Sequence, residues 1–170
     1  MDPRKIYKFC PICGKGMIGK QDNPECSSCG FIFYINPAPA CGAIIENDKQ
    51  QILLVKRKYD PKKGYWDLPG GFMAPDEDVD ASIKRELREE LGVVIEVKKV
   101  VGFYPDVYVF QNVAYPVLDI IVDAKIIGGN LSPADDVTEY AFFPKEQVLQ
   151  QQLAFSKIRR ALEDYLGGIS

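Results

Sequence analysis

Three glutamates crowd the last turns of one predicted helix, residues 79–91. At about 100° per residue, Glu86 and Glu90 fall within about 20° of Val79, at the edge of an apolar stripe, and Glu89 lies nearby. The stripe consists of Val79, Ile83, Leu87 and Leu91. Two glutamates four residues apart repel each other, and the negative end of the helix dipole disfavours both. A hard divalent cation such as Mg²⁺, which prefers carboxylate oxygens, is the simplest compensation.

The alternative interpretation is an acidic helix face exposed to solvent, with Arg85 and Arg88 screening part of the charge. That is the usual explanation of a charged run. The position of Glu86 and Glu90 beside the apolar stripe favours a functional site instead, because partial burial of an unpaired carboxylate is unfavourable. The chain contains no histidine, which excludes histidine-dependent triads and histidine-ligated metals. A glutamate is therefore the natural proton acceptor.

Four cysteines form two Cys-x2-Cys pairs with twelve residues between them, Cys10 with Cys13 and Cys26 with Cys29. A glycine follows each pair and suits the positive φ of a tight metal-binding turn. Two such pairs can bind one zinc, and four sulfurs leave no open position, so we expect a structural zinc in a segment that resembles a zinc ribbon. Disulfides or a redox pair fit less well, because the first residues lack the apolar core of a signal peptide and a redox pair does not explain the duplication. Cys41 is expected in the core.

The remaining chain alternates between strand-like and helix-like segments. We expect strands at residues 41–45, 52–56, 93–103, 107–114, 117–127 and 140–143, and helices at 79–91 and within 145–166. Strands mixed with a central and a terminal helix predict an α/β sandwich. We expect two domains, a zinc ribbon over residues 1–35 and an α/β domain over residues 36–170.

The predicted helix and the loop before it match a known signature. The pattern G-x5-E-x7-R-E-U-x-E-E-x-G-U, where U is aliphatic, is matched at every defined position by Gly71, Glu77, Arg85-Glu86-Leu87, Glu89-Glu90 and Gly92-Val93. This chain therefore resembles the Nudix hydrolases. The preceding residues, Trp66-Asp67-Leu68-Pro69-Gly70, are similar to the segment that usually precedes this signature in Nudix hydrolases. The resemblance implies a Nudix-type α/β/α sandwich with a mixed sheet over residues 37–170.

The resemblance also implies roles for the glutamates. Glu86 and Glu90 correspond to the main ligands of Mg²⁺ or Mn²⁺, and the backbone carbonyl of Gly70 corresponds to a third. Glu89 would bind further metal or act as the general base.

Two further roles follow from the same resemblance. Arg85 would orient the glutamates by pairing with Glu77. Many family members add a glutamate from a distal loop as a metal ligand. Glu139 is the best positional match for it, and Asp135 and Asp136 are the alternatives.

Nudix enzymes hydrolyse the pyrophosphate of a nucleoside diphosphate linked to another group and release a nucleoside monophosphate. A zinc ribbon before such a domain is similar to the NADH pyrophosphatase group. That group carries a Ser-Gln-Pro-Trp motif shortly after the Nudix signature, whereas this chain has Gly102-Phe103-Tyr104-Pro105-Asp106 in the corresponding stretch. The expected substrates therefore include ADP-ribose, NADH and FAD-like compounds, with triphosphates or a capped RNA end as alternatives. Tyr104 and Tyr108 are candidates for stacking on the substrate, although strand aromatics are more often core residues.

The charge of the chain bears on its partners. A formal charge of −3 disfavours nucleic acid or a membrane surface as the partner, so we expect a small nucleotide substrate. No apolar run approaches eighteen residues and the first residues lack the apolar core of a signal peptide, so we expect a cytoplasmic protein. The resemblance is compatible with a homodimer. The alternative function is a non-catalytic nucleotide-sensing or nucleic-acid-binding module, which the basic residues of the first segment would favour: Arg4, Lys5, Lys8, Lys15 and Lys20.

Overall fold

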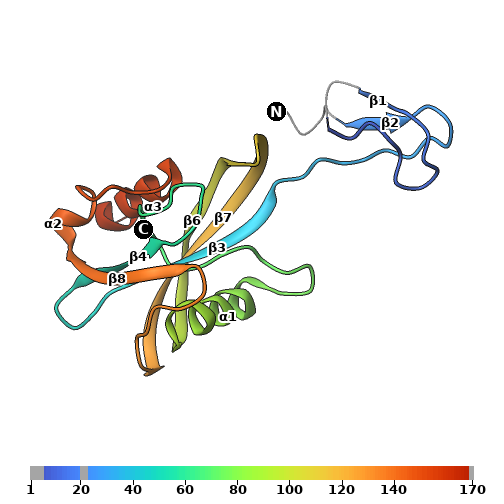
Figure 1. Ribbon diagram of the computed structural model, residues 1–170. Helices are drawn as coiled ribbons and strands as arrows, with labels where there is room; N and C mark the ends of the chain where they lie inside the picture. Colours follow the sequence, from blue (N-terminus) through green and yellow to red (C-terminus); the bar gives the residue numbers. More distant parts are fainter. Residues whose placement is uncertain (1–5, 20–22, 169–170) are drawn as a thin grey trace. The chain divides into compact units, whose positions relative to one another are not determined.

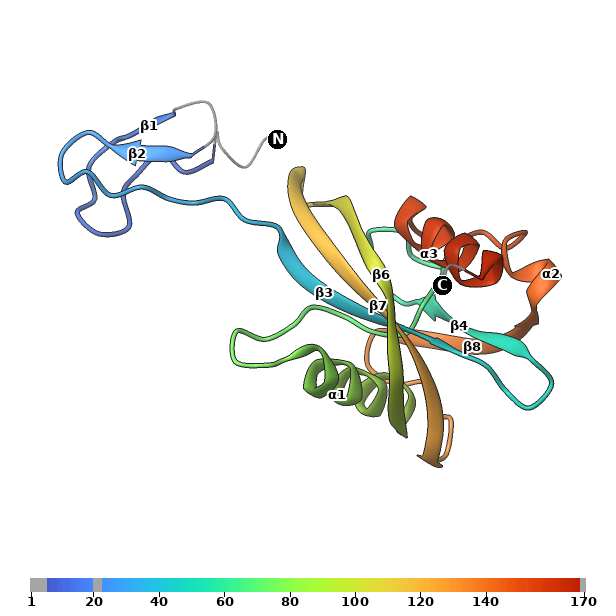
Figure 2. The same ribbon diagram turned by 180° about the vertical axis from the view of Figure 1, so that it is seen from behind.

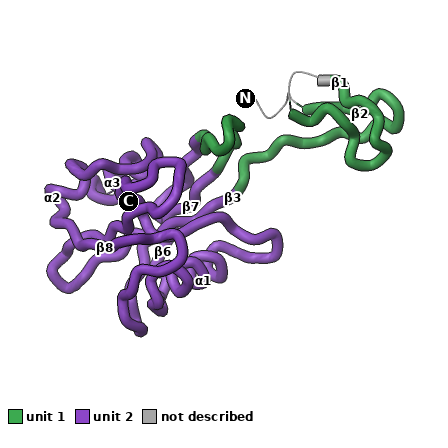
Figure 3. Tube along the Cα trace, in the orientation of Figure 1, with its two compact units in different colours: residues 1–38, 107–117 green, residues 39–106, 118–170 purple. Residues whose placement is uncertain are grey.

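The structure is a computed structural model that describes residues 6–19 and 23–168. Arg4, Lys5 and Lys20, which the binding-module alternative uses, lie outside the described residues. The chain divides into two compact units (Figure 3): residues up to 38 with residues 107–117, and residues 39–106 with residues 118–170. Within the described ranges, no helix is long and apolar enough to cross a membrane.

The first unit contains a small antiparallel ladder and few buried side chains. Strand β1 (Met17–Gly19) pairs with β2 (Pro24–Cys26), and Met17 lies opposite Cys26. Large apolar side chains such as Phe9 and Ile12 are 72% and 70% exposed. Within residues 6–35, the apolar core residues among those described are the cysteines Cys10 and Cys26. A segment with so little apolar burial needs another source of stability.

The second unit is built from two three-stranded sheets and three helices. One sheet has the order β3-β7-β6 and the other β5-β4-β8, in which β4 is antiparallel to both neighbours. The strands are β3 (Ala38–Ile45), β4 (Gln51–Arg57), β5 (Trp66–Asp67), β6 (Val93–Phe110), β7 (Val113–Gly129) and β8 (Val137–Pro144). The helices are α1 (Val79–Leu91), α2 (Lys145–Val148) and α3 (Ser156–Gly167).

Strand side chains alternate between two apolar cores, because successive residues of a strand point to opposite faces. In β4, Leu53 and Val55 join a core with α1, whereas Ile52 and Leu54 join a second core with α3. Figure 1 and the view from behind in Figure 2 show α1 on one side of the strands and α3 on the other. These layers confirm the predicted α/β/α sandwich. Strands buried on both faces explain the continuous apolar runs of the sequence.

The strand boundaries between residues 93 and 129 differ from the prediction. The expected strand 93–103 and residues 107–110, the first half of the expected strand 107–114, merge into the single strand β6, and the chain reverses at Gln111 and Asn112. Both turn residues have positive φ, 47° and 63°, as a two-residue hairpin requires. Pro105 and Pro116 lie between the expected strands 93–103, 107–114 and 117–127. In the structure both lie within strands, and Pro105 lies in β6, an edge strand, where a missing N–H donor is tolerated.

Candidate active site

Helix α1 begins and ends at well-defined caps that fix the position of its glutamates. The Asp78 carboxylate accepts a hydrogen bond from the N–H of Ala81 at 2.8 Å. Gly92 adopts the left-handed conformation at φ 69°, and its N–H donates a hydrogen bond to the carbonyl of Arg88. Between the caps, Ile83, Leu87 and Leu91 are fully buried. This packing turns the Glu86–Glu90 edge of the helix toward the loop at Gly70.

Glu90 lies under the Gly70 turn and is only 4% exposed. The N–H of Gly70 donates to Glu90 Oε2 at 2.9 Å. Gly70 has φ 138°, and a Cβ there would lie 2.2 Å from the carbonyl oxygen of Cys41, so only glycine fits. The turn therefore places its backbone against a buried carboxylate.

Arg85 organises the carboxylates around it. Its Nε and Nη2 donate to the two carboxylate oxygens of Glu77 at 2.7 and 2.9 Å. Its Nη1 donates to Glu86 at 2.7 Å and to Glu89 at 3.0 Å. The Arg85 guanidinium lowers the pKa of Glu77 to about 2. The pairing expected of Arg85 and Glu77 is present, and the same guanidinium holds Glu86 and Glu89 in place.

The next glycine, Gly71, leaves room for the carboxylate of Glu86. A Cβ at Gly71 would lie 2.7 Å from Glu86 Cδ. We expect Gly71→Ala to displace this carboxylate and to lower the rate of pyrophosphate hydrolysis by at least about tenfold, because small misplacements of a catalytic group are costly. Steady-state kinetics test this. The matched control is Gly167→Ala, where no atom lies within 4 Å of the added Cβ. Equal activity of the two variants would contradict the expectation.

Burial and neighbouring negative charge raise the pKa values of the central glutamates. Burial is the main cause for Glu90, whose pKa is raised well above its usual value, and the nearby Asp136 raises it further. Burial also raises the pKa of Glu86, although Arg85 opposes the shift. No ion pair to Glu90 or Asp136 occurs among the described residues. A buried acidic set with incomplete compensation fits a divalent cation such as Mg²⁺ or Mn²⁺.

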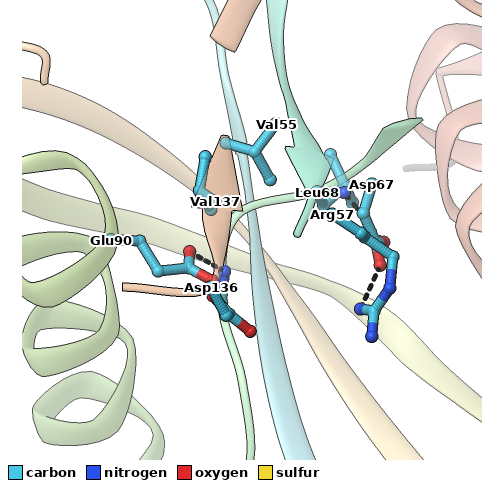
Figure 4. Close-up of a pocket in the computed structure, with 8 residues that line it drawn as sticks. Val55, Arg57, Asp67, Leu68, Glu90, Asp136 and Val137 are labelled. Carbon is cyan, nitrogen blue, oxygen red and sulfur yellow. Dashed lines mark hydrogen bonds and ion pairs between the residues drawn. The ribbon is translucent and has the colours of Figure 1, made fainter. Parts of the chain in front are cut away.

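A small cavity of about 20 Å³ lies in front of Glu90, and Figure 4 shows the residues that line it. Its lining is Val55, Arg57, Asp67, Leu68, Gly70, Glu90, Asp136 and Val137. On the side opposite Glu90, Arg57 Nη1 donates to Asp67 Oδ2 at 3.1 Å. Burial raises the pKa of Asp67 to about 6, against the lowering effect of Arg57. Apart from the place of Asp67 just before Gly70, nothing in the sequence predicts this pair, because the two residues are ten positions apart on different strands.

Asp136, rather than Glu139, reaches the glutamates. Glu139 lies opposite Lys56 in the β4–β8 ladder and pairs with Lys56 Nζ at 2.5 Å, with its side chain 52% exposed. Asp136 immediately precedes β8 and lines the cavity with Glu90. Of the three candidates considered for the distal carboxylate, the structure brings Asp136 into the cluster.

We expect Asp136→Asn to lower the hydrolysis rate by roughly tenfold to a hundredfold, as loss of a carboxylate next to a metal site does. Glu139→Gln removes the same charge three residues away and is expected to change the rate by less than about twofold. Initial rates at several Mg²⁺ concentrations compare the two variants. A larger loss for Glu139→Gln would show that the distal ligand comes from β8 itself.

The two tyrosines proposed for stacking occupy different environments. Tyr104 is 5% exposed, lies in the core on the α3 side, and donates its hydroxyl to Asp164 Oδ2 at 2.8 Å. Its ring is covered, so the expected stacking role does not suit this position. Tyr108 is half-buried in β6, with its ring centroid 6.4 Å from that of Phe110.

The four cysteines of the first unit come together as their spacing predicts. The ligand sulfurs of Cys10, Cys13, Cys26 and Cys29 all lie within 4.8 Å of one another. The Cys10–Cys29 and Cys13–Cys26 sulfur distances are 3.7 and 3.5 Å, and the thiols are free. The N–H groups of Cys29 and Ser28 lower the pKa of Cys26 to about 6, which favours the thiolate. The cluster fits a zinc site.

Comparison with known proteins agrees with this geometry. The family model described as the NUDIX domain matches residues 36–165. An ADP-ribose pyrophosphatase of Methanocaldococcus jannaschii is 38% identical over 138 residues, which are 80% of this chain and 77% of that protein. The NAD-capped RNA hydrolase NudC of Deinococcus radiodurans is 29% identical over 98% of this chain, but the match spans only 59% of NudC.

A solved structure extends the agreement to the fold. The crystal structure of a NUDIX hydrolase from Nitrosomonas europaea superposes with a TM-score of 0.76 at 27% identity, over 95% of this chain and 92% of that one. The family match covers most of the chain and includes the helix, the glycine turn and the glutamates described above. The chain belongs to the Nudix hydrolase family.

Proposed function

We propose that this protein catalyses Mg²⁺-dependent hydrolysis of the pyrophosphate in a nucleoside diphosphate linked to another group, releasing a nucleoside monophosphate. Candidate substrates are ADP-ribose, NADH and FAD-like compounds. Membership of the Nudix family supports pyrophosphate hydrolysis. The observation that carries the proposal is the set of carboxylates formed by Glu86, Glu90 and Asp136 beside the Gly70 turn. The archaeal relative makes ADP-ribose the first compound to test.

Glu86, Glu90 and the carbonyl of Gly70 would hold the divalent cation, with Asp136 as a further carboxylate. When bound, the cation would neutralise the charge of the pyrophosphate and lower the pKa of the attacking water. Burial of Glu90 keeps competing water away from its carboxylate.

Glu89 would act as the general base or contribute further oxygen atoms to the metal site. Its side chain is 47% exposed, so a water molecule can reach it, and Arg85 fixes one of its oxygens at 3.0 Å. Arg85 is itself oriented by Glu77 through two hydrogen bonds. Glu77 and Arg85 would thus position the groups that accept the proton and bind the metal.

We further infer that the cysteine cluster holds a structural zinc, within a ribbon domain over residues 1–35 that precedes a hydrolase domain over residues 36–170. Four thiolates leave no coordination position for a substrate, so this zinc would stabilise structure and take no part in the reaction. The reducing cytoplasm, which keeps thiolates available, is the proposed location.

The test uses purified protein with Mg²⁺ and ADP-ribose, NADH, NAD, FAD and nucleotide sugars in separate reactions. Anion-exchange chromatography separates the products. Release of AMP or another nucleoside monophosphate that requires Mg²⁺ and stops with EDTA supports the proposal. Equilibrium binding of the same compounds without turnover, under Mg²⁺ and Mn²⁺, would instead identify a nucleotide-sensing module.

A further inference from the structure

The end of β4 and the loop that joins it to β5 concentrate positive charge in an acidic protein. Residues 56–65 contain five lysine or arginine residues and one aspartate, whereas the whole chain has a formal charge of −3. Such a local excess of one sign creates a positive field that extends over about a Debye length, roughly 8 Å at physiological salt. The loop is therefore attractive to anions.

Only part of this positive charge is neutralised by neighbouring carboxylates. Lys56 pairs with Glu139 at 2.5 Å, and Arg57 pairs with Asp67 at 3.1 Å. Within the part of the chain that the structure describes, no carboxylate forms an ion pair with the other three cations of the loop, Lys58, Lys62 and Lys63. No carboxylate therefore neutralises these three ammonium groups, although Lys62 Nζ lies 5.2 Å from the ring of Tyr65. Their positive charge can still attract an external anion.

The loop has a defined conformation held by backbone hydrogen bonds. The N–H of Arg57 donates to the carbonyl of Tyr65 at 3.0 Å, and the N–H of Gly64 donates to the carbonyl of Arg57 at 2.8 Å. Arg57 Nε also donates to the carbonyl of Pro61 at 2.9 Å, across the loop. A pre-ordered loop loses little conformational entropy when a ligand binds.

The loop borders the carboxylate site directly. The N–H of Lys58 donates to the carbonyl of Asp136 at 2.7 Å, and its Nζ donates to the carbonyl of Asp135 at 2.8 Å. Asp136 in turn lines the cavity with Glu90. Lys58 Nζ also lies 5.2 Å from the ring of Tyr59. Tyr59 is 57% exposed, so an exposed aromatic ring lies beside this cation.

The metal site would neutralise the scissile pyrophosphate, and these cations lie on the loop that borders that site. We propose that Lys58, Lys62 and Lys63 form a subsite for substrate phosphate groups that lie outside the scissile pyrophosphate. This inference rests on the proposed function. Two sources share this chemistry, a small nucleotide with an additional phosphate and the first nucleotides of an RNA strand whose 5′ end carries the pyrophosphate.

The test compares substrates that differ only in the additional phosphates. Wild-type protein is assayed with NAD, with NADP, which adds one 2′-phosphate, and with a short NAD-capped oligoribonucleotide. We expect the phosphate-bearing substrate to have a kcat/KM roughly fivefold or more above that of NAD at low salt, mainly through KM, with the advantage lost at high salt. A preference for NADP identifies the small nucleotide, and a preference for the oligonucleotide alone identifies the RNA strand.

The variant K62Q/K63Q is expected to lose this preference and to keep wild-type kcat/KM on NAD. The matched control K49Q/K99Q removes two exposed lysines elsewhere and should keep the preference. Equal kcat/KM on all three substrates in the wild type, or an unchanged preference in K62Q/K63Q, would overturn the subsite.

Calorimetric titration of the same compounds separates this inference from the proposed function. Selective binding of NADP or of the oligonucleotide that K62Q/K63Q abolishes, without any turnover, would retain the subsite and reject the hydrolase. Turnover of NAD with no selectivity in rate or binding would retain the hydrolase and reject the subsite.

Discussion

Replacing Glu90 with glutamine is expected to lower kcat for pyrophosphate hydrolysis by roughly a thousandfold, about 4 kcal/mol of transition-state stabilisation. Glu90 is 4% exposed and the N–H of Gly70 holds its carboxylate in place. Glutamine keeps the shape and one acceptor oxygen but removes the negative charge that a hard cation prefers. Initial rates of AMP release across a range of Mg²⁺ concentrations measure the loss.

The same substitution is expected to raise the melting temperature when divalent cations are absent. Burial, reinforced by Asp136, raises the pKa of Glu90 in the folded protein above its unfolded value. The stability contributed by such a group is fully present below the unfolded pKa and is lost as pH rises through the folded pKa. Glutamine has no charge to bury, so Glu90→Gln should melt higher than wild type in EDTA at pH 8, and the difference should shrink at acidic pH.

Magnesium provides a second readout for Glu90. A cation that binds only the folded protein raises its melting temperature, so Mg²⁺ should stabilise the wild type and have little effect on Glu90→Gln. Glu163→Gln, an exposed change of the same kind on α3, is the control and should behave as wild type. A Glu90→Gln variant with normal kcat would remove Glu90 from the metal site.

Loss of zinc is expected to unfold the cysteine-containing segment. Structural zinc contributes roughly 10–16 kcal/mol in comparable peptides, far more than this segment can gain from burial. Strands β1 and β2 have three residues each, and Phe9 and Ile12 point largely into solvent. We expect one zinc per chain by metal analysis. Cys10→Ser, or a strong chelator, should make residues 6–35 sensitive to protease while residues 39–106 and 118–168 stay resistant.

Cys41→Ala provides the control for the cysteine substitutions. Cys41 is 3% exposed within the core beside α1, and its thiol contacts the hydroxyl of Ser82 at 3.3 Å. This variant should keep one zinc per chain, because Cys41 is not among the four clustered sulfurs. Protein that carries no zinc yet resists protease over residues 6–35 would show that another interaction stabilises the segment.

The sequence by itself determined the features that depend on short spacing. The caps and apolar stripe of α1 are local, so the helix and the edge that carries Glu86 and Glu90 follow from the 3.6-residue period. The Cys-x2-Cys pairs bring their sulfurs together for the same reason, since each pair is one tight turn. The alternation of helices and apolar strands likewise predicted the layered α/β fold.

Only the tertiary structure decided which distant residues meet. The β4–β8 register places Glu139 opposite Lys56 and leaves Asp136 beside Glu90, a choice that depends on pairing between strands far apart in sequence. Tyr104 is buried because α3 packs over it, and Asp164 accepts a hydrogen bond from its hydroxyl, a contact across 60 residues. Local periodicity determines on which face of a helix or strand a side chain lies. Strand register and helix packing determine which residues that face contacts.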